Sequence, residues 1–77
     1  MKVTVRVVGH AVEFFPGGKD RYDLVLETPL SVAGIIEKLG VARALVMAAV
    51  VDGKRRGLDY VPGNGAEVIL MTPPAGG

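Results

Sequence analysis

One short helical pattern, set among strand patterns, constrains the fold of this chain most. Apolar residues recur at i, i+3, i+4 and i+7 after Ser31, which is a good N-cap, and before Gly40, which is a typical left-handed helix end. The predicted helix has about two turns, too few to be stable alone in water. It must therefore lie across a sheet through its apolar stripe, formed by Val32, Ile35, Ile36 and Leu39.

Two strand patterns precede this helix. The segments Lys2 to Val8 and Arg21 to Glu27 alternate polar and apolar residues, as strands with one buried face do. We expect an antiparallel hairpin with a long loop over Gly9 to Asp20, whose Pro-Gly-Gly sequence signals a turn and in which one of Phe14 and Phe15 is exposed. Val3, Val5 and Val7 are expected to point inward, and Tyr22, Leu24 and Leu26 to share one side of the second strand.

Three further strand patterns follow the helix. Leu45 to Val51 is nearly all apolar and predicts a strand buried on both faces. The Asp52-Gly53 pair predicts a tight hairpin turn that leads into Lys54 to Arg56, an exposed edge strand. A turn at Gly63 to Gly65 precedes the last strand, Glu67 to Met71.

The order strand, strand, helix, strand, short edge strand, strand predicts an α+β fold of the β-grasp (ubiquitin-like) type. We expect a mixed sheet of four to five strands with one helix packed across one face. In that fold the last strand pairs centrally with the first, so the chain leaves the sheet as a free tail. We predict a single domain over residues 1–72 and a flexible C-terminal tail over residues 73–77.

The composition excludes several kinds of chemistry. The chain has no cysteine, which excludes disulfides, thiolate metal sites and a nucleophilic thiol, and its one histidine, His10, cannot form a metal cluster alone. The net charge of +1 gives no general attraction to nucleic acid. No apolar run is long enough to cross a bilayer, so we expect a cytoplasmic protein with no membrane partner. Any chemistry is expected to use the backbone or residues of a partner.

The last five residues have the form of a tail that can enter a narrow site. Pro73 and Pro74 hold the chain extended, and Ala75 leads to Gly76 and Gly77, which have no side chains to obstruct a channel. Chain ends are often disordered, and two glycines can occur together by chance. The tail therefore gains meaning from the fold that carries it.

The chain resembles the MoaD/ThiS family of ubiquitin-like sulfur carriers over most of its length. The resemblance is carried by Thr28 to Val32, by Val50 to Lys54 and by Gly63 to Leu70 followed by the Pro-Pro-Ala-Gly-Gly tail. It implies a carrier protein that is not itself an enzyme. An activating enzyme of the ubiquitin-activating type would use ATP and Mg²⁺ to adenylate Gly77, while Pro73, Pro74, Ala75 and Gly76 thread into that partner.

The resemblance also implies two further partners. A sulfur donor would convert the adenylate to a thiocarboxylate, and a sulfur-accepting synthase would take the sulfur for molybdopterin, thiazole or a related product. This chain itself would bind no metal and no cofactor. Molybdopterin-type carriers usually have one more tail residue, an apolar partner contact at the position of Thr72 and a helical stretch within Gly9 to Asp20, so the pathway is left open.

The candidate partner surface comprises Ile69, Met71, Arg55 and Arg56. Ile69 and Met71 would form an apolar patch if they face away from the helix. Lys54 to Arg56 is either a solvated edge that prevents strand aggregation, a docking patch for an acidic partner, or an RNA contact with Tyr60 as a stacking ring; the balanced charge makes nucleic acid the weakest option.

Two other functions remain open from the sequence. A ubiquitin-like modifier would use the same adenylate to join Gly77 to a lysine of another protein. A plain protein-binding module would make no use of the glycines.

Overall fold

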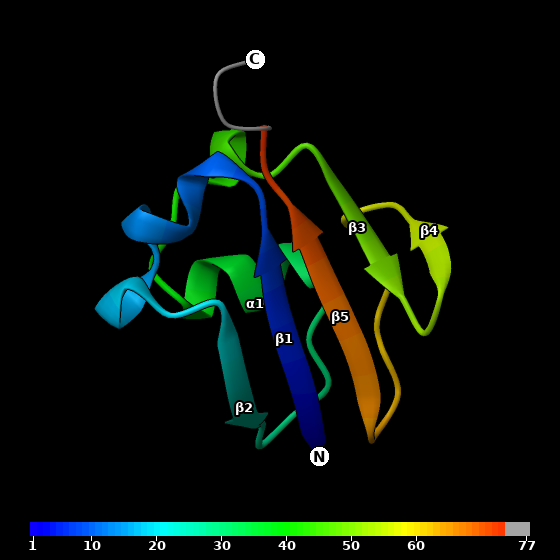
Figure 1. The fold of residues 1–77 in the computed structure, drawn as a ribbon. Helices are drawn as coiled ribbons and strands as arrows, with labels where there is room; N and C mark the ends of the chain where they lie inside the picture. Colours follow the sequence, from blue (N-terminus) through cyan, green and yellow to red (C-terminus); the bar gives the residue numbers. More distant parts are fainter. Residues whose placement is uncertain (74–77) are drawn as a thin grey trace.

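The computed structural model describes residues 1–73, which form one five-stranded sheet with a helix packed on one face (Figure 1). The strand order is β2-β1-β5-β3-β4. This confirms the predicted α+β, β-grasp arrangement. None of the helices in the described part of the chain has the length and apolar character needed to cross a membrane. The elements are β1 (Lys2–Val8), β2 (Arg21–Val25), α1 (Val32–Lys38), β3 (Ala48–Val51), β4 (Lys54–Arg56) and β5 (Ala66–Met71).

The first and last strands pair in parallel at the centre of the sheet, as the fold predicts. Their register runs from Val3 opposite Ala66 to Val8 opposite Met71, so β1 and β5 end at the same end of the sheet. The strands β2 and β3 flank this pair in antiparallel orientation. The chain therefore leaves the sheet beside the point where β1 also ends.

The core lies between the sheet and α1. Alternate residues of β1 and β5 face the helix, and Val5, Val68 and Leu70 are completely buried. The helix begins as predicted, because the Ser31 Oγ accepts a hydrogen bond from the Gly34 N–H at 3.1 Å. The predicted stripe of the helix and the predicted inward valines of β1 all belong to the core.

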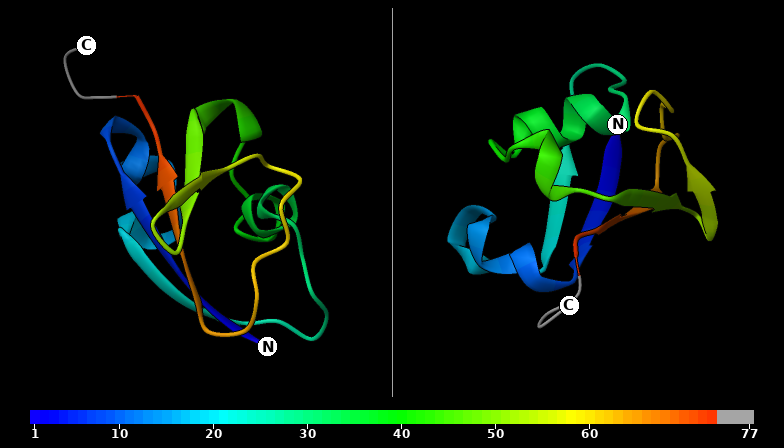
Figure 2. Two further views of the ribbon diagram at one scale, coloured as in Figure 1. Left: turned by 90° about the vertical axis from the view of Figure 1, so that its right-hand side faces the viewer. Right: turned by 90° about the horizontal axis from the view of Figure 1, so that it is seen from above.

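The third strand is shorter than the sequence predicts. Arg43–Leu45 forms a turn of 3₁₀ helix, Met47 is exposed, and only Ala48–Val51 belongs to β3. Burial alternates along β3, with Ala49 and Val51 buried and Ala48 and Val50 half-buried, because α1 covers only one face of the sheet (Figure 2). The prediction of a strand buried on both faces is therefore wrong.

The Asp52-Gly53 turn and the exposed edge strand are both confirmed. Asp52 and Gly53 have φ angles of 50° and 83°, the left-handed values that a two-residue hairpin turn requires. β4 follows as an edge strand of the sheet, and its three residues are exposed.

The segment predicted as a long loop after β1 contains two short 3₁₀ helices, His10–Phe14 and Pro16–Gly18. A helical stretch is therefore present here, against expectation. It forms because Phe15 is buried between the two helices and anchors them to the core, while its neighbour Phe14 is exposed. The expected split between the adjacent phenylalanines is confirmed.

Candidate functional site

Pairing between β1 and β5 continues past the last strand residue, up to the point where the tail begins. The Thr72 N–H donates to the Val8 carbonyl at 2.8 Å, and the His10 N–H donates to the Pro73 carbonyl at 2.7 Å. Pro73 is exposed but is held through its backbone. The predicted tail residues Pro74, Ala75, Gly76 and Gly77 lie outside the described residues, so their predicted threading role and flexibility stay predictions.

The resemblance to molybdopterin-type carriers puts a partner contact at position 72, but Thr72 is buried. Its side chain is 6% exposed. The Thr72 Oγ1 donates to the Val8 carbonyl at 2.9 Å and accepts from the Ala11 N–H at 3.1 Å. Thr72 is thus an internal hydrogen-bonding residue that joins the start of the tail to the segment after β1.

Figure 2 shows α1 on one face of the sheet. On the opposite face, apolar side chains of β1, β3 and β5 form a patch next to the start of the tail. Residues paired directly across neighbouring strands point to the same face, so Met71 lies beside Val8 and Ile69 beside Val50. Met71 is 41% and Val8 48% exposed. We call this surface the open-face patch; it comprises Val8, Ala48, Val50, Ile69 and Met71.

Arginines stand on both sides of the open-face patch. Arg6 is paired with Ile69 across the centre of the sheet, and Arg55 is paired with Val50 at the edge. Arg21 is in turn paired with Arg6, and its guanidinium lies 3.7 Å from the Asp23 carboxylate, which offsets its charge. The patch is therefore an apolar surface with a basic rim, which suits a partner surface that is apolar with acidic residues around it.

Arg6 and Val8 are members of this surface that the sequence reasoning missed. The alternation of β1 carries the signal for both, since outward residues of a central strand must lie on the uncovered face once the inward valines are assigned. Ile69, Met71 and Arg55 lie on the same face of the sheet, and their role as a partner surface stays a prediction.

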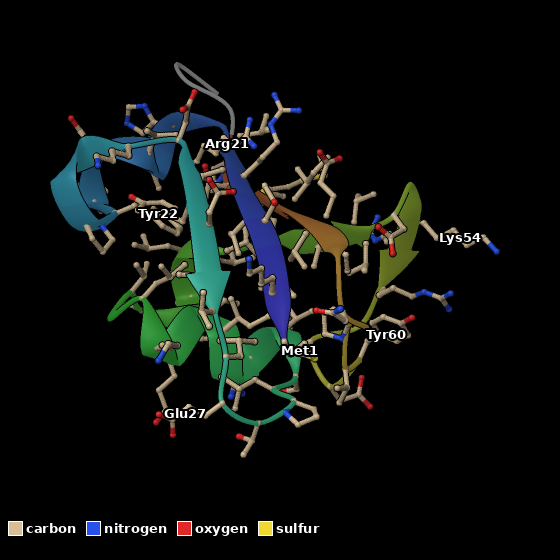
Figure 3. All side chains as sticks on the ribbon, turned by 90° about the horizontal axis from the view of Figure 1, so that it is seen from below. Met1, Arg21, Tyr22, Glu27, Lys54 and Tyr60 are labelled. Carbon is tan, nitrogen blue, oxygen red and sulfur yellow. The ribbon has the colours of Figure 1, made fainter. Side chains whose placement is uncertain are left out.

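Arg56 is not part of this surface. It is paired with the buried Ala49 and therefore points to the side of the sheet where α1 lies. Its guanidinium stacks 4.6 Å from the ring centre of Tyr60, which Figure 3 shows on that side of β4. Because Arg56 covers one face of the ring, Tyr60 is not an open stacking platform for an RNA base.

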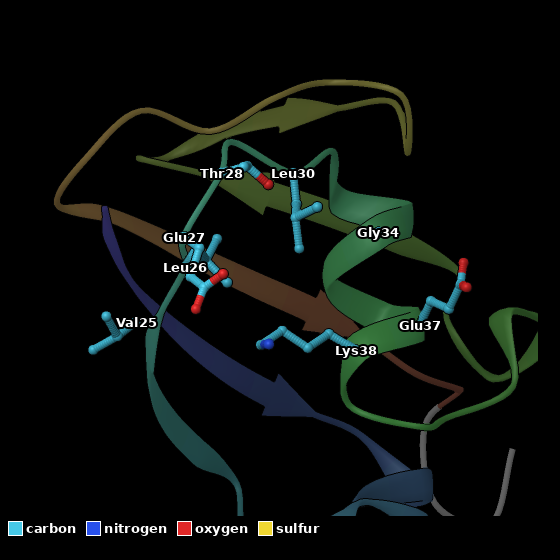
Figure 4. Close-up of a pocket in the computed structure, with 8 residues that line it drawn as sticks. All are labelled: Val25, Leu26, Glu27, Thr28, Leu30, Gly34, Glu37 and Lys38. Carbon is cyan, nitrogen blue, oxygen red and sulfur yellow. The ribbon is translucent and has the colours of Figure 1, made fainter.

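A hollow of about 540 Å³ lies at the other end of the sheet, between the end of β2 and α1 (Figure 4). Glu27, Glu37 and Lys38 contribute charged groups to it, and Leu30 contributes an apolar wall. No histidine or cysteine lines it. Within residues 1–73, no group of three or more potential metal-binding side chains comes together.

No protein-family model and no curated protein matches the sequence. Among solved structures, the fold is similar to SAMP1 from Haloferax volcanii, with a TM-score of 0.73 and 15% identity over 100% of both chains. It is also similar to Urm1 from Trypanosoma brucei, with a TM-score of 0.72 and 18% identity over 99% of this chain and 95% of that protein. The chain thus has the ubiquitin-like β-grasp fold.

Proposed function

We propose that this chain is a sulfur carrier that is activated at Gly77 and acts as a protein substrate, not as a catalyst. The observation that carries the proposal is the common end of β1 and β5. This arrangement puts Pro73, where the predicted tail begins, beside the open-face patch with its basic rim. Four residues beyond Pro73 span at most about 13 to 14 Å, so a partner that covers the patch has the end of the chain within its reach.

The proposed chemistry begins with activation of the Gly77 carboxylate, because a carboxylate is a poor acyl donor. One of its oxygens attacks the α-phosphorus of ATP, the bond to the β-phosphate breaks, and pyrophosphate leaves. The product is an acyl-adenylate. Mg²⁺ and the groups that stabilise the developing charge belong to the activating enzyme.

Sulfur then replaces AMP. The terminal sulfur of a persulfide on the donor protein attacks the acyl carbon and AMP leaves, which gives an acyl disulfide. A thiol reductant cleaves the S–S bond, leaving the thiocarboxylate on Gly77 and a mixed disulfide elsewhere. The thiocarboxylate sulfur next attacks an electrophilic carbon of the acceptor and displaces a leaving group from it. Water then hydrolyses the acyl–sulfur bond, which leaves the sulfur on the acceptor and restores the carboxylate.

Three kinds of observation support this function. The chain resembles the MoaD/ThiS carriers in its turn, helix-start and tail sequences, and the ubiquitin-like fold is the one that sulfur carriers and protein modifiers use. The absence of cysteine leaves no side-chain thiol on which this chain could carry sulfur. Molybdopterin, thiazole and related pathways remain the proposed destinations.

Intact-mass analysis of the protein purified from its own host tests the proposal. A chain that ends at Gly77 and gains the mass difference of one oxygen replaced by sulfur supports the carrier. Covalent conjugates to lysines of other proteins would support a modifier instead. Deletion of Gly77 should abolish ATP–pyrophosphate exchange with the host's activating enzyme and leave stability unchanged; a truncated protein that is still activated would contradict the proposal.

A further inference from the structure

Gly9 approaches Thr72 more closely than any other residue could at position 9. A Cβ built on Gly9 would lie 2.3 Å from the Thr72 carbonyl oxygen and 2.4 Å from its Oγ1. Gly9 also has a φ of 110°, which L side chains rarely adopt. The end of β1 can therefore close onto the residue before the tail only because position 9 has no side chain.

Hydrogen bonds hold this contact from both sides. The Thr72 hydroxyl bridges the Val8 carbonyl and the Ala11 N–H, and the His10 N–H donates to the Pro73 carbonyl. Thr72 is the one polar or charged side chain that is buried within residues 1–73, and its hydroxyl both donates and accepts a hydrogen bond. We call Gly9, His10, Thr72 and Pro73, joined in this way, the tail latch.

We propose that the tail latch is a positioning device: it fixes the place and direction in which the chain leaves the sheet, with Thr72 as the positioning residue. This inference rests on the proposed activation of Gly77. The latch holds Pro73 at a set position relative to Met71 in the open-face patch. A partner that docks on the patch then receives the tail at a defined point.

The position of the latch separates it from both the core and the docking surface. The hydrophobic core of the central strand pair ends at Val7 and Leu70, and Thr72 lies two residues beyond Leu70. The side chains of the open-face patch point away from α1, whereas the Thr72 hydroxyl points back to the segment after β1. Loss of the hydroxyl should thus loosen residue 72, whose N–H still donates to the Val8 carbonyl, while the core and the patch persist.

Because the reach from Pro73 to Gly77 is short, a loosely held start of the tail should lower the rate of activation. With about 13 to 14 Å of chain after Pro73, there is little slack to correct a misplaced start. Each backbone residue that must be ordered again in the transition state lowers the rate about 5- to 30-fold. Docking affinity, which depends on the open-face patch, should change little.

The test compares two pairs of variants in ATP–pyrophosphate exchange with the activating enzyme of the chain's own host. T72V removes the hydroxyl at nearly constant volume, and T72S keeps it. We expect T72V to lower kcat about 5- to 30-fold with KM within about twofold of wild type, and T72S to retain most of the wild-type kcat. T72S falling as far as T72V would overturn the role of the hydroxyl.

The second pair breaks the other half of the latch without touching a buried side chain. H10P removes the N–H that donates to Pro73, at the first position of a 3₁₀ helix where proline is tolerated, whereas H10A keeps it. We expect kcat to fall in H10P and not in H10A. If T72V folds poorly, this second pair tests the tail latch. Wild-type kcat in H10P, with exchange intact in wild type, would overturn the latch but not the proposed function. No exchange in wild type would overturn both.

Discussion

Arg6 and Ile69 lie side by side across the central pair of strands, on the face of the sheet opposite α1. Arg55 stands on the far side of Val50 in the same row, so cations border the apolar centre from two directions. This row combines apolar area for docking with charge for steering. Substitutions on the apolar centre and on the basic rim should therefore have different effects on docking.

The apolar part of the open-face patch should be needed for docking. M71D puts a carboxylate into the patch next to the start of the tail, where a bound partner would strip water from an unpaired charge. We expect KM in ATP–pyrophosphate exchange to rise about tenfold or more. V25D is the matched control, since Val25 is 68% exposed on the same face but lies at the other end of the sheet, opposite Lys2. Equal effects of both changes would contradict the placement of the docking surface.

The basic rim should act mainly on the rate of association. R6E reverses a charge beside Ile69, and we expect the association rate with the activating enzyme to fall about tenfold at low ionic strength, with a smaller effect at high salt. Stopped-flow measurements at two salt concentrations test this. R56E changes the net charge by the same amount on the opposite face and should leave the association rate nearly unchanged. A similar loss in R56E would mean that net charge, and not the rim, steers the partner.

The sequence predicts the central elements of this fold well because their signals are local. Alternation along β1, the stripe and cap of α1, and the Asp52-Gly53 turn each depend on neighbours a few residues away. The residue at which β3 begins could not be predicted in the same way. Leu45 and Met47 are apolar enough for a buried strand, but the sheet has only one covered face, which is a property of the whole fold.

Some residues of the candidate site are likewise predictable from their neighbours in sequence, and others are not. Ile69 and Met71 are predictable because alternation puts them opposite the buried Val68 and Leu70. The burial of Thr72 is not predictable from its neighbours, because it depends on a contact with Gly9 at the other end of the chain. Arg55 and Arg56 are adjacent on a strand and so point to opposite faces, but only the register with β3 shows which of them lies on the face of the open-face patch.

The core under the central strands should carry much of the stability. Leu70 is completely buried, so L70A should lower the free energy of unfolding by about 2 to 5 kcal/mol through lost burial and a cavity. Urea unfolding followed by circular dichroism measures the change. M71A alters the next residue, on the other face of the same strand, and should cost less than about 1 kcal/mol. Comparable losses for the two would contradict the assignment of faces along β5.

In the hairpin turn between β3 and β4, a glycine-to-alanine change should lower the free energy of unfolding, whereas the same change at a control glycine should not. Gly53 has a φ of 83° with open space around it, so G53A meets no clash and should cost about 1 to 2 kcal/mol through backbone strain alone. Gly63 also has open space but no positive φ. G63A should therefore leave stability unchanged or raise it by up to about 1 kcal/mol, because alanine restricts the unfolded chain. Urea unfolding of both variants separates the cases, and a loss of stability in G63A equal to that in G53A would contradict the left-handed turn as the cause.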